Sequence, residues 1–180
     1  KFDDEVVLCV MPLFHVFAVH MCLYLTAYCR GHLVILRRYQ PDVVLSAIEE
    51  FGLTRLPAGP TVYNGLMAFD GFSDTNFSSL RTAWSGSAPL PLDTLQRWEK
   101  ATGCPILEGY GQSEAGPVLT YVSEGQALKA GSVGKVLPLT EVQIVDTETG
   151  EQVLPVGDQG EIRARGPQLM SGYRNRPEET

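Results

Sequence analysis

The sequence predicts an α/β protein, in which a mostly parallel sheet flanked by helices is followed by a smaller antiparallel β subdomain. Short, continuous apolar runs alternate with stretches of helical periodicity as far as Glu108. This order is typical of parallel strands joined by helices. After about Gly131 the pattern changes, because polar and apolar residues alternate in 141–146 and again in 161–165. Such alternation indicates antiparallel strands with one solvated face.

These two patterns divide the chain into two expected domains. Residues 1–125 form a central α/β subdomain that carries the ligand-binding turns, and residues 126–180 form the antiparallel β subdomain. We place the boundary in the loop 123–130. The chain has no initiator Met and stops in mid-pattern at Thr180, so we expect both ends to be cuts through a longer protein, with the second subdomain truncated.

Runs rich in Val, Leu and Ile predict the strands of the first domain, because strands of a parallel sheet are covered on both faces. In chain order, these strands are expected over 6–10, 33–36, 53–57, 80–84 and 105–107.

Periodicity and terminal residues predict four helices, which begin near Val16, Pro41, Pro60 and Pro91. Proline suits the first turn of a helix, since its missing N–H has no partner there in any case. Apolar residues at 44, 47, 48 and 51 follow the i, i+3, i+4, i+7 spacing of a helix with one buried face. Three glycines supply the expected helix stops, at Gly31, Gly52 and Gly103. Residues 71–79 are expected to form a polar loop.

The composition excludes some classes of function. The 180 residues carry a formal net charge of −7, and no basic stripe is present to hold phosphates along a nucleic acid, so we expect no nucleic-acid partner. The apolar run 13–29 is short for a membrane span and carries two histidines. We read it as a buried helix and expect no transmembrane segment; peripheral membrane contact and oligomeric state stay open.

The four cysteines form no C-x-x-C pair. Three of them lie in apolar runs, so we interpret them as small buried hydrophobes in a reducing compartment and expect a cytoplasmic protein. The chain opens with charged residues and without the apolar region of a signal peptide.

Three turns are expected at one edge of the sheet, over 12–15, 85–89 and 108–114. Each follows a predicted strand, and ligands of parallel sheets bind beyond the carboxyl ends of the strands. We therefore expect these turns to converge on a binding site.

The turn 108–114 carries the most chemistry. Gly109 and Gly111 allow close approach of a ligand, and Tyr110 between them offers a flat face for stacking. The hydroxyl of Ser113 can donate to a phosphate oxygen. Glu114 offers the hard oxygen ligand that magnesium prefers. Taken alone, the same residues also describe an ordinary glycine-rich turn.

Four motifs occur in a fixed order: MPLFH at 11–15, SGSAPL at 85–90, GYGQSE at 109–114, and GEI at 160–162 with GPQLMSGY at 166–173. This ordered set resembles the adenylate-forming, or AMP-binding, superfamily of acyl-CoA synthetases, luciferases and peptide-synthetase adenylation domains. The resemblance covers nearly the whole chain. Within the superfamily, the sequence is most similar to the fatty-acyl-CoA and 4-coumarate-CoA ligases.

The resemblance implies roles for named residues. The implied catalytic residues are His15, Ser113 and Glu114, with Glu114 as the metal ligand. The implied nucleotide-binding residues are Gly86, Ser87, Ala88, Glu108, Gly109, Tyr110, Gly111, Gln112 and Ser113. The implied acid pocket contains His15, Gly111, Pro117 and Val118, with Phe17, Met21 and Pro60 as further candidates. His20 and His32 have no matching family position and are read as structural.

The resemblance also implies a reaction and its cofactors. A carboxylic acid, in our reading a medium- or long-chain fatty acid, is activated with ATP and Mg²⁺ to an acyl-adenylate, and coenzyme A then displaces AMP. The family's phosphate loop, ribose-binding aspartate and catalytic lysine have no match in these residues, so we expect the isolated chain to complete neither half-reaction.

Three alternatives remain open from the sequence. The first is an aryl or hydroxycinnamate CoA ligase, and the second is a peptide-synthetase adenylation domain. The third is a non-catalytic binding module that keeps the same fold; the intact glycine-rich turns and Glu114 argue against it.

Overall fold

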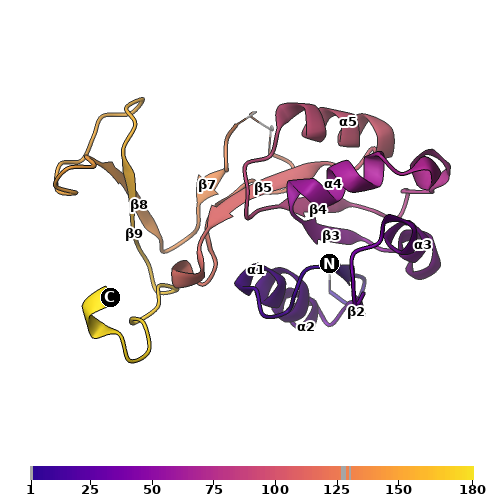
Figure 1. Ribbon diagram of the computed structural model, residues 1–180, viewed down its shortest axis with the longest axis horizontal. Helices are drawn as coiled ribbons and strands as arrows, with labels where there is room; N and C mark the ends of the chain where they lie inside the picture. Colours follow the sequence, from indigo (N-terminus) through magenta and orange to yellow (C-terminus); the bar gives the residue numbers. More distant parts are fainter. Residues whose placement is uncertain (1, 127–128, 130) are drawn as a thin grey trace.

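The computed structural model describes residues 2–126, 129 and 131–180, and it confirms the predicted fold class (Figure 1). A seven-stranded sheet dominates it, and a separate two-stranded sheet follows. Side by side, the strands of the main sheet are β2 (His32–Ile35), β1 (Val6–Cys9), β3 (Arg55–Ala58), β4 (Thr82–Ser85), β5 (Ile106–Gly111), β6 (Val118–Tyr121) and β7 (Lys135–Val136). The second sheet pairs β8 (Glu141–Val145) with β9 (Glu161–Arg165) in antiparallel register.

The first five strands run parallel, as predicted, and their order reverses at β1. The connection from β1 to β2 moves toward one edge of the sheet, whereas the later connections move toward the other. Because such crossovers are right-handed, a reversal places their helices on opposite faces. It also opens a crevice at the carboxyl ends of the strands.

The helices are α1 (Val16–Ala18), α2 (Leu25–Cys29), α3 (Pro41–Phe51), α4 (Pro60–Met67) and α5 (Leu92–Thr102), with η1 (Val19–Tyr24) a π-helical stretch and η2 (Asp70–Asp74), η3 (Ser113–Ala115) and η4 (Pro177–Glu179) short 3₁₀ turns. Proline stands in the first turn of α3 and α4, and Pro91 is the N-cap of α5. Gly52 and Gly103 end α3 and α5 with φ of 60° and 70°, the left-handed conformation that favours glycine.

The two faces of the sheet carry different helices. Successive residues of a strand point to opposite faces, and in β1 Leu8 packs with α3, α4 and α5 whereas Val7 and Cys9 pack with Ala18 and Cys22. Figure 1 shows α4 and α5 on one side of the sheet and the α1–α2 run on the other. The main core therefore lies under α3, α4 and α5.

The run α1–η1–α2 is one continuous helical stretch, 16–29, interrupted by a π-helical turn. Its left-handed C-cap is Arg30, with φ of 54°, so the predicted stop at Gly31 is displaced by one residue. Gly31 is required for another reason, because a Cβ there would lie 2.3 Å from the backbone oxygen of Glu5. Among the described residues, none of the helices reaches the length and apolarity needed to cross a membrane.

The predicted polar loop 71–79 is partly a core element. It contains η2, and it buries Phe72 and Phe77, which are 8% and 7% exposed. Both rings lie 5.8 Å from the ring of Trp98 on α5, between centroids. The aromatic pair is part of the main core. The polar residues around the pair in the sequence led to the prediction of a polar loop.

The chain after β5 differs from the prediction. β5 extends to Gly111, so the residues expected to form a turn begin as a strand, and β6 and β7 add antiparallel strands to the main sheet. The domain boundary in the loop 123–130 stays a prediction, and residues 127, 128 and 130 of that loop lie outside the described part.

A buried ion pair holds the amino ends of the strands together. Arg55 and Glu5, which are 8% and 4% exposed, form two hydrogen bonds of 2.9 and 3.1 Å. Arg55 also pairs with Glu124 beyond β6, and its guanidinium lies 5.1 Å from the ring centroid of Trp84. Burial alone would raise the pKa of Glu5, but the hydrogen bonds from Arg55 and Thr54 outweigh it and lower the pKa to about 2.

Replacing Arg55 with leucine is expected to reduce the free energy of unfolding by about 3 kcal/mol, because it strips a buried carboxylate of its main cation. Urea unfolding followed by circular dichroism measures this loss. The matched control is Arg97→Leu, which removes an exposed i, i+4 pair with Asp93 and is expected to cost less than about 0.5 kcal/mol. Equal losses in the two variants would contradict the prediction.

The same ion pair predicts a pH dependence. The pKa of Glu5 is lowered in the folded state, so its contribution is complete above its ordinary pKa of about 4.3 and is lost as the pH falls toward 2. Over this interval wild-type stability is expected to fall more steeply than that of Arg55→Leu.

Candidate functional site

A cavity of about 830 Å³ lies at the carboxyl ends of the central strands. One wall is the helical stretch 16–29, and the other is built by the ends of β4 and β5 and by β6. The predicted site residues that line it are His15, Gly86, Ser87, Glu108, Gly109, Tyr110, Gly111, Gln112, Ser113, Glu114, Pro117 and Val118, together with Phe17 and Met21. Ala88 and Pro60 are not among the lining residues. The three predicted turns therefore meet at one cavity.

The turn after β4 is tied directly to β5. Ser85 pairs with Glu108 across the two parallel strands, and Oε1 of Glu108 accepts a 3.0 Å hydrogen bond from the backbone N–H of Leu90. The Glu108 carboxylate, predicted to belong to the nucleotide site, thus holds the turn 86–90 in place. Ser87 within this turn has φ of 68°, an uncommon value for a residue other than glycine.

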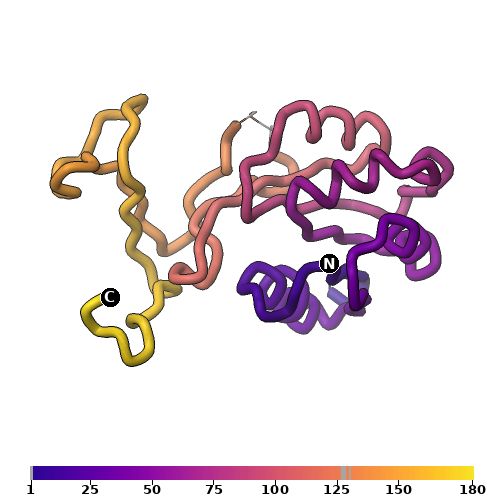
Figure 2. The backbone as a smooth tube through the Cα atoms, viewed as in Figure 1, coloured from indigo at the N-terminus to yellow at the C-terminus, as the bar shows by residue number. Residues whose placement is uncertain are grey.

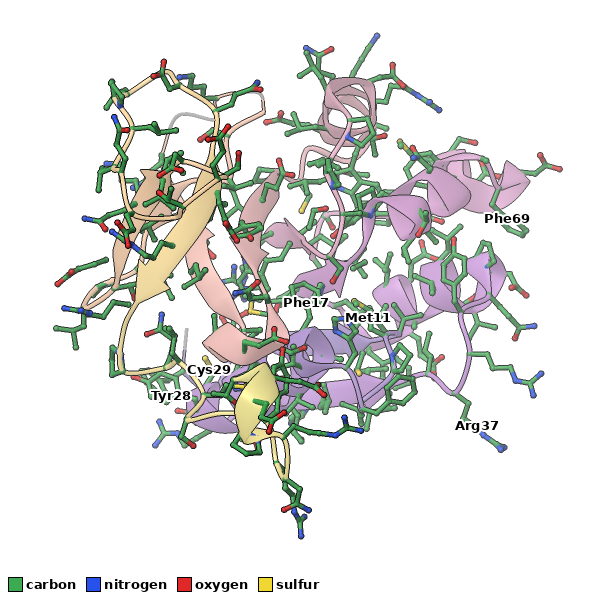
Figure 3. All side chains as sticks on the ribbon, turned by 60° about the vertical axis from the view of Figure 1, so that its left-hand side comes forward. Met11, Phe17, Tyr28, Cys29, Arg37 and Phe69 are labelled. Carbon is green, nitrogen blue, oxygen red and sulfur yellow. The ribbon has the colours of Figure 1, made fainter. Side chains whose placement is uncertain are left out.

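Gly86 lies against the helical wall. A Cβ at Gly86 would come 3.1 Å from Cε2 of Phe17, so the absence of a side chain lets the turn approach the helix. Figure 3 shows Phe17 between the helical stretch and the strands. Gly86 and Phe17 therefore bring the two walls of the cavity close together.

Gly109 and Gly111 serve the pairing of β5 with β6. A Cβ at Gly109 would lie 3.1 Å from the backbone oxygen of Thr120, and one at Gly111 would lie 1.7 Å from that of Pro117. The ladder shifts register between Tyr110 and Gly111, as at a β-bulge, where side chains are re-aimed. Tyr110 is half-buried and lines the cavity.

Glu114 lies in η3, the short turn after β5. The phenol of Tyr173 donates a 2.6 Å hydrogen bond to Oε1 of Glu114, and this bond lowers the pKa of the carboxyl. The same bond raises the pKa of the Tyr173 phenol. Glu114 is therefore an ionised carboxylate in the cavity wall at neutral pH, with Ser113 beside it.

His15 caps the helical stretch that forms the other wall. Its Nδ1 accepts a 3.2 Å hydrogen bond from the backbone N–H of Phe17. An accepting Nδ1 carries no proton, so the neutral ring holds its proton on Nε2. Nε2 is then the donor that His15 offers to a ligand.

The cavity wall also contains residues that the sequence analysis did not assign. Two of them, Trp84 and Ser85, end β4; Ser85 is 1% exposed, and among the described residues nothing pairs with its hydroxyl. Others come from the helical stretch, at His20, Tyr24, Leu25 and Tyr28. With Phe17 and Met21 they form an i, i+3, i+4 stripe, which is the signal that could have identified them.

His20 has the contacts of a structural residue and also lines the cavity. Its Nδ1 lies 3.0 Å from the backbone oxygen of Val16 and its ring packs edge-on against Tyr24, which agrees with a structural residue. The ring nevertheless lines the cavity, so it also helps to shape the pocket.

Comparison with known proteins agrees with this geometry. Residues 1–174 match the model of the family described as AMP-binding enzyme, and the chain belongs to that family. It is 38% identical over 180 residues to the long-chain-fatty-acid–CoA ligase of Bacillus subtilis, covering all of this chain and 32% of the relative. It is 35% identical over 183 residues to 4-coumarate–CoA ligase 5 of Oryza sativa subsp. japonica, covering 99% of this chain and 34% of the relative.

The chain is also similar in fold and sequence to solved structures. The crystal structure of ATP-bound MatB from Rhodopseudomonas palustris superimposes with a TM-score of 0.89 at 31% identity, covering 99% of this chain and 35% of that one. The chain thus spans about a third of the length of the relatives it matches.

Substituting Gly111 with alanine is expected to lower the free energy of unfolding by about 2 kcal/mol or more, because the added Cβ meets backbone rather than a flexible side chain. Urea unfolding measures the effect. Gly59→Ala is the matched control, since its Cβ would have only the backbone oxygen of Gly86 nearby, at 3.8 Å. A Gly111→Ala protein as stable as Gly59→Ala would rule out the close approach.

Proposed function

We propose that this chain forms the central part of the adenylate site of an AMP-forming acid–CoA ligase. Such an enzyme joins a carboxylic acid to AMP with release of pyrophosphate, and coenzyme A thiol then displaces AMP to give a thioester. The observation that supports the proposal most strongly is the single cavity shared by His15, Tyr110 and Glu114. The family membership and the named activities of the relatives point in the same direction.

The proposed roles follow the chemistry of each side chain. Tyr110 stacks on adenine, and the turn of Gly86, Ser87 and Ala88 offers its backbone groups to the edge of the base. The Ser113 hydroxyl donates to the α-phosphate. The half-buried ring of Tyr110 suits stacking.

Gly109 and Gly111 line the cavity at the end of β5, where the lack of a side chain leaves room for close approach of the ligand. Glu108 and Gln112 complete the nucleotide-binding stretch, with Glu108 acting through its bond to the turn at Leu90. Positioning of this kind is the main contribution an enzyme makes to transfer at phosphorus.

Magnesium fits the carboxylate that this site offers. The bond from Tyr173 lowers the pKa of the Glu114 carboxyl, and across residues 2–126, 129 and 131–180 no group of three or more His, Cys, Asp or Glu residues could enclose a metal. Magnesium is commonly held by one or two carboxylates together with substrate phosphates. When bound, the ion would neutralise phosphate charge, and Glu114 would hold it beside Ser113.

His15 lines the same cavity as Glu114 and Ser113. With Nδ1 engaged by the helix, its Nε2–H is placed to donate to an oxygen of the acid or of the α-phosphate. We assign His15 the role of orienting the carboxylate and stabilising charge on oxygen. Pro117 and Val118 border the region where the acid would lie.

We propose a medium- or long-chain fatty acid as the substrate. Apolar side chains line much of the cavity, with Val118 in β6, Leu137 after β7, and Phe17, Met21 and Leu25 in the helical wall, and they suit an alkyl chain. A hydroxycinnamate is the second candidate, favoured by His20 and Tyr24 in the same wall and by the similarity to 4-coumarate ligases. We place the reaction in the cytoplasm, in keeping with the free, mostly buried thiols.

Glu114→Gln is expected to lower acid-dependent ATP–pyrophosphate exchange by about 100-fold, because a neutral amide cannot replace the charge of the carboxylate on the metal. The assay uses a protein of the relatives' full length that contains this chain. Glu99→Gln, an exposed residue on α5, is the control and should retain wild-type exchange. Nucleotide binding by the wild type without any exchange would support the non-catalytic module instead.

A panel of acids in the same assay tests the substrate. Alkanoic acids of about eight to sixteen carbons are expected to give higher kcat/KM than 4-hydroxycinnamate, because extra buried methylenes each contribute about 0.8 kcal/mol. A preference for the cinnamate would replace the fatty-acid proposal with the aryl one.

A further inference from the structure

The segment after β9 lies against the turn that follows β5, where it contacts Glu114. Figure 2 shows this C-terminal stretch, in yellow, beside the chain that leaves β5. It carries the motif 166–173, which the sequence analysis singled out without giving it a role. The role of this segment follows from the hydrogen bonds that it makes.

Two of these contacts hold a single residue, Glu114. The backbone N–H of Met170 donates a 2.8 Å hydrogen bond to the backbone oxygen of Glu114. The phenol of Tyr173 donates a 2.6 Å hydrogen bond to Oε1 of its side chain. Main chain and carboxylate are thus held by the same short segment, which fixes both the position of Glu114 and its rotamer.

The segment itself is seated on the sheet. Nε2 of Gln168 donates a 2.8 Å hydrogen bond to Oγ1 of Thr140. The backbone oxygen of Gln168 approaches Gly116, where a Cβ would lie only 2.8 Å from it. Gly116 has φ of 54°, a conformation that also favours glycine. The segment is therefore anchored at Gln168, two residues before Met170.

We propose that Tyr173 is a positioning residue for the metal ligand, and that its hydrogen bond to Oε1 holds the Glu114 carboxylate in the position from which it would bind magnesium. This rests on the proposed function, in which Glu114 binds the ion. Free glutamate side chains sample several rotamers, and a bond from a neutral phenol to a carboxylate is one of the stronger side-chain bonds. Tyr173 thus removes the cost of ordering Glu114 when the ion arrives.

A phenol that competed with the cation for the Glu114 carboxylate would have the opposite effect, because removing its hydroxyl would strengthen magnesium binding. Positioning predicts that the same change weakens it, so the direction of the effect decides between the two.

The test is Tyr173→Phe in the full-length protein, measured by calorimetric ATP binding without acid over a magnesium titration. We expect the magnesium concentration for half-maximal ATP binding to rise about 3- to 10-fold, which corresponds to the net worth of one typical intramolecular hydrogen bond. ATP binding at saturating magnesium should recover. Tyr39→Phe is the matched control, because it removes a phenol bond to the backbone of Val62 in the core, away from the cavity, and should leave the titration unchanged.

A double-mutant cycle shows whether Tyr173 acts through Glu114. At fixed magnesium, Tyr173→Phe should weaken ATP binding in the wild-type background and have little further effect in a Glu114→Ala background. Equal effects in both backgrounds, a decreased magnesium requirement, or no change would each overturn the proposal.

These failures are separable from failure of the proposed function. A wild-type protein without magnesium-dependent ATP binding would remove the function itself. A wild type that binds ATP with magnesium, combined with an unaffected Tyr173→Phe variant, would remove only the role of Tyr173.

Discussion

The parallel pairing of β4 with β5 is the constraint on which the site depends. Ser85, the last residue of β4, opposes Glu108 in this ladder, so the turn that follows β4 lies beside the second half of β5. The bond from Leu90 to the Glu108 carboxylate then locks the first turn onto the second strand. A half-buried carboxylate that accepts a bond from a backbone N–H satisfies both partners, and Tyr110 and Glu114 line the cavity beyond it.

Strand order supplies the other wall. Because the order reverses at β1, the helical stretch 16–29 covers the face opposite to α3, α4 and α5 (Figure 1). His15 caps the start of this stretch, so the reversal brings its ring to the turns of β4 and β5. The π-helical turn η1 lies within the same wall, and such turns are frequent at functional sites.

The two ends of the sheet have different physical characters. At the amino ends, Arg55 binds Glu5 and Glu124 in a mostly buried arrangement that joins β3 to the chain beyond β6. At the carboxyl ends, the backbone approaches closely across Gly111 and leaves polar groups directed into an open cavity. The fixed amino ends support the strands that carry the site, and a site needs such rigid support to hold its ligands in one geometry.

The sequence by itself determined the alternation of parallel strands and helices, and the residues that converge on the cavity, because apolar periodicity and glycine or proline punctuation are local properties. The family likeness extended this to an expected set of roles. Tertiary structure decided what depends on where the chain returns. It added β6 and β7 to the sheet, buried Phe72 and Phe77 against Trp98, and joined Tyr173 to Glu114 across 59 positions of sequence. Such contacts follow from the path of the whole chain, which no local pattern encodes.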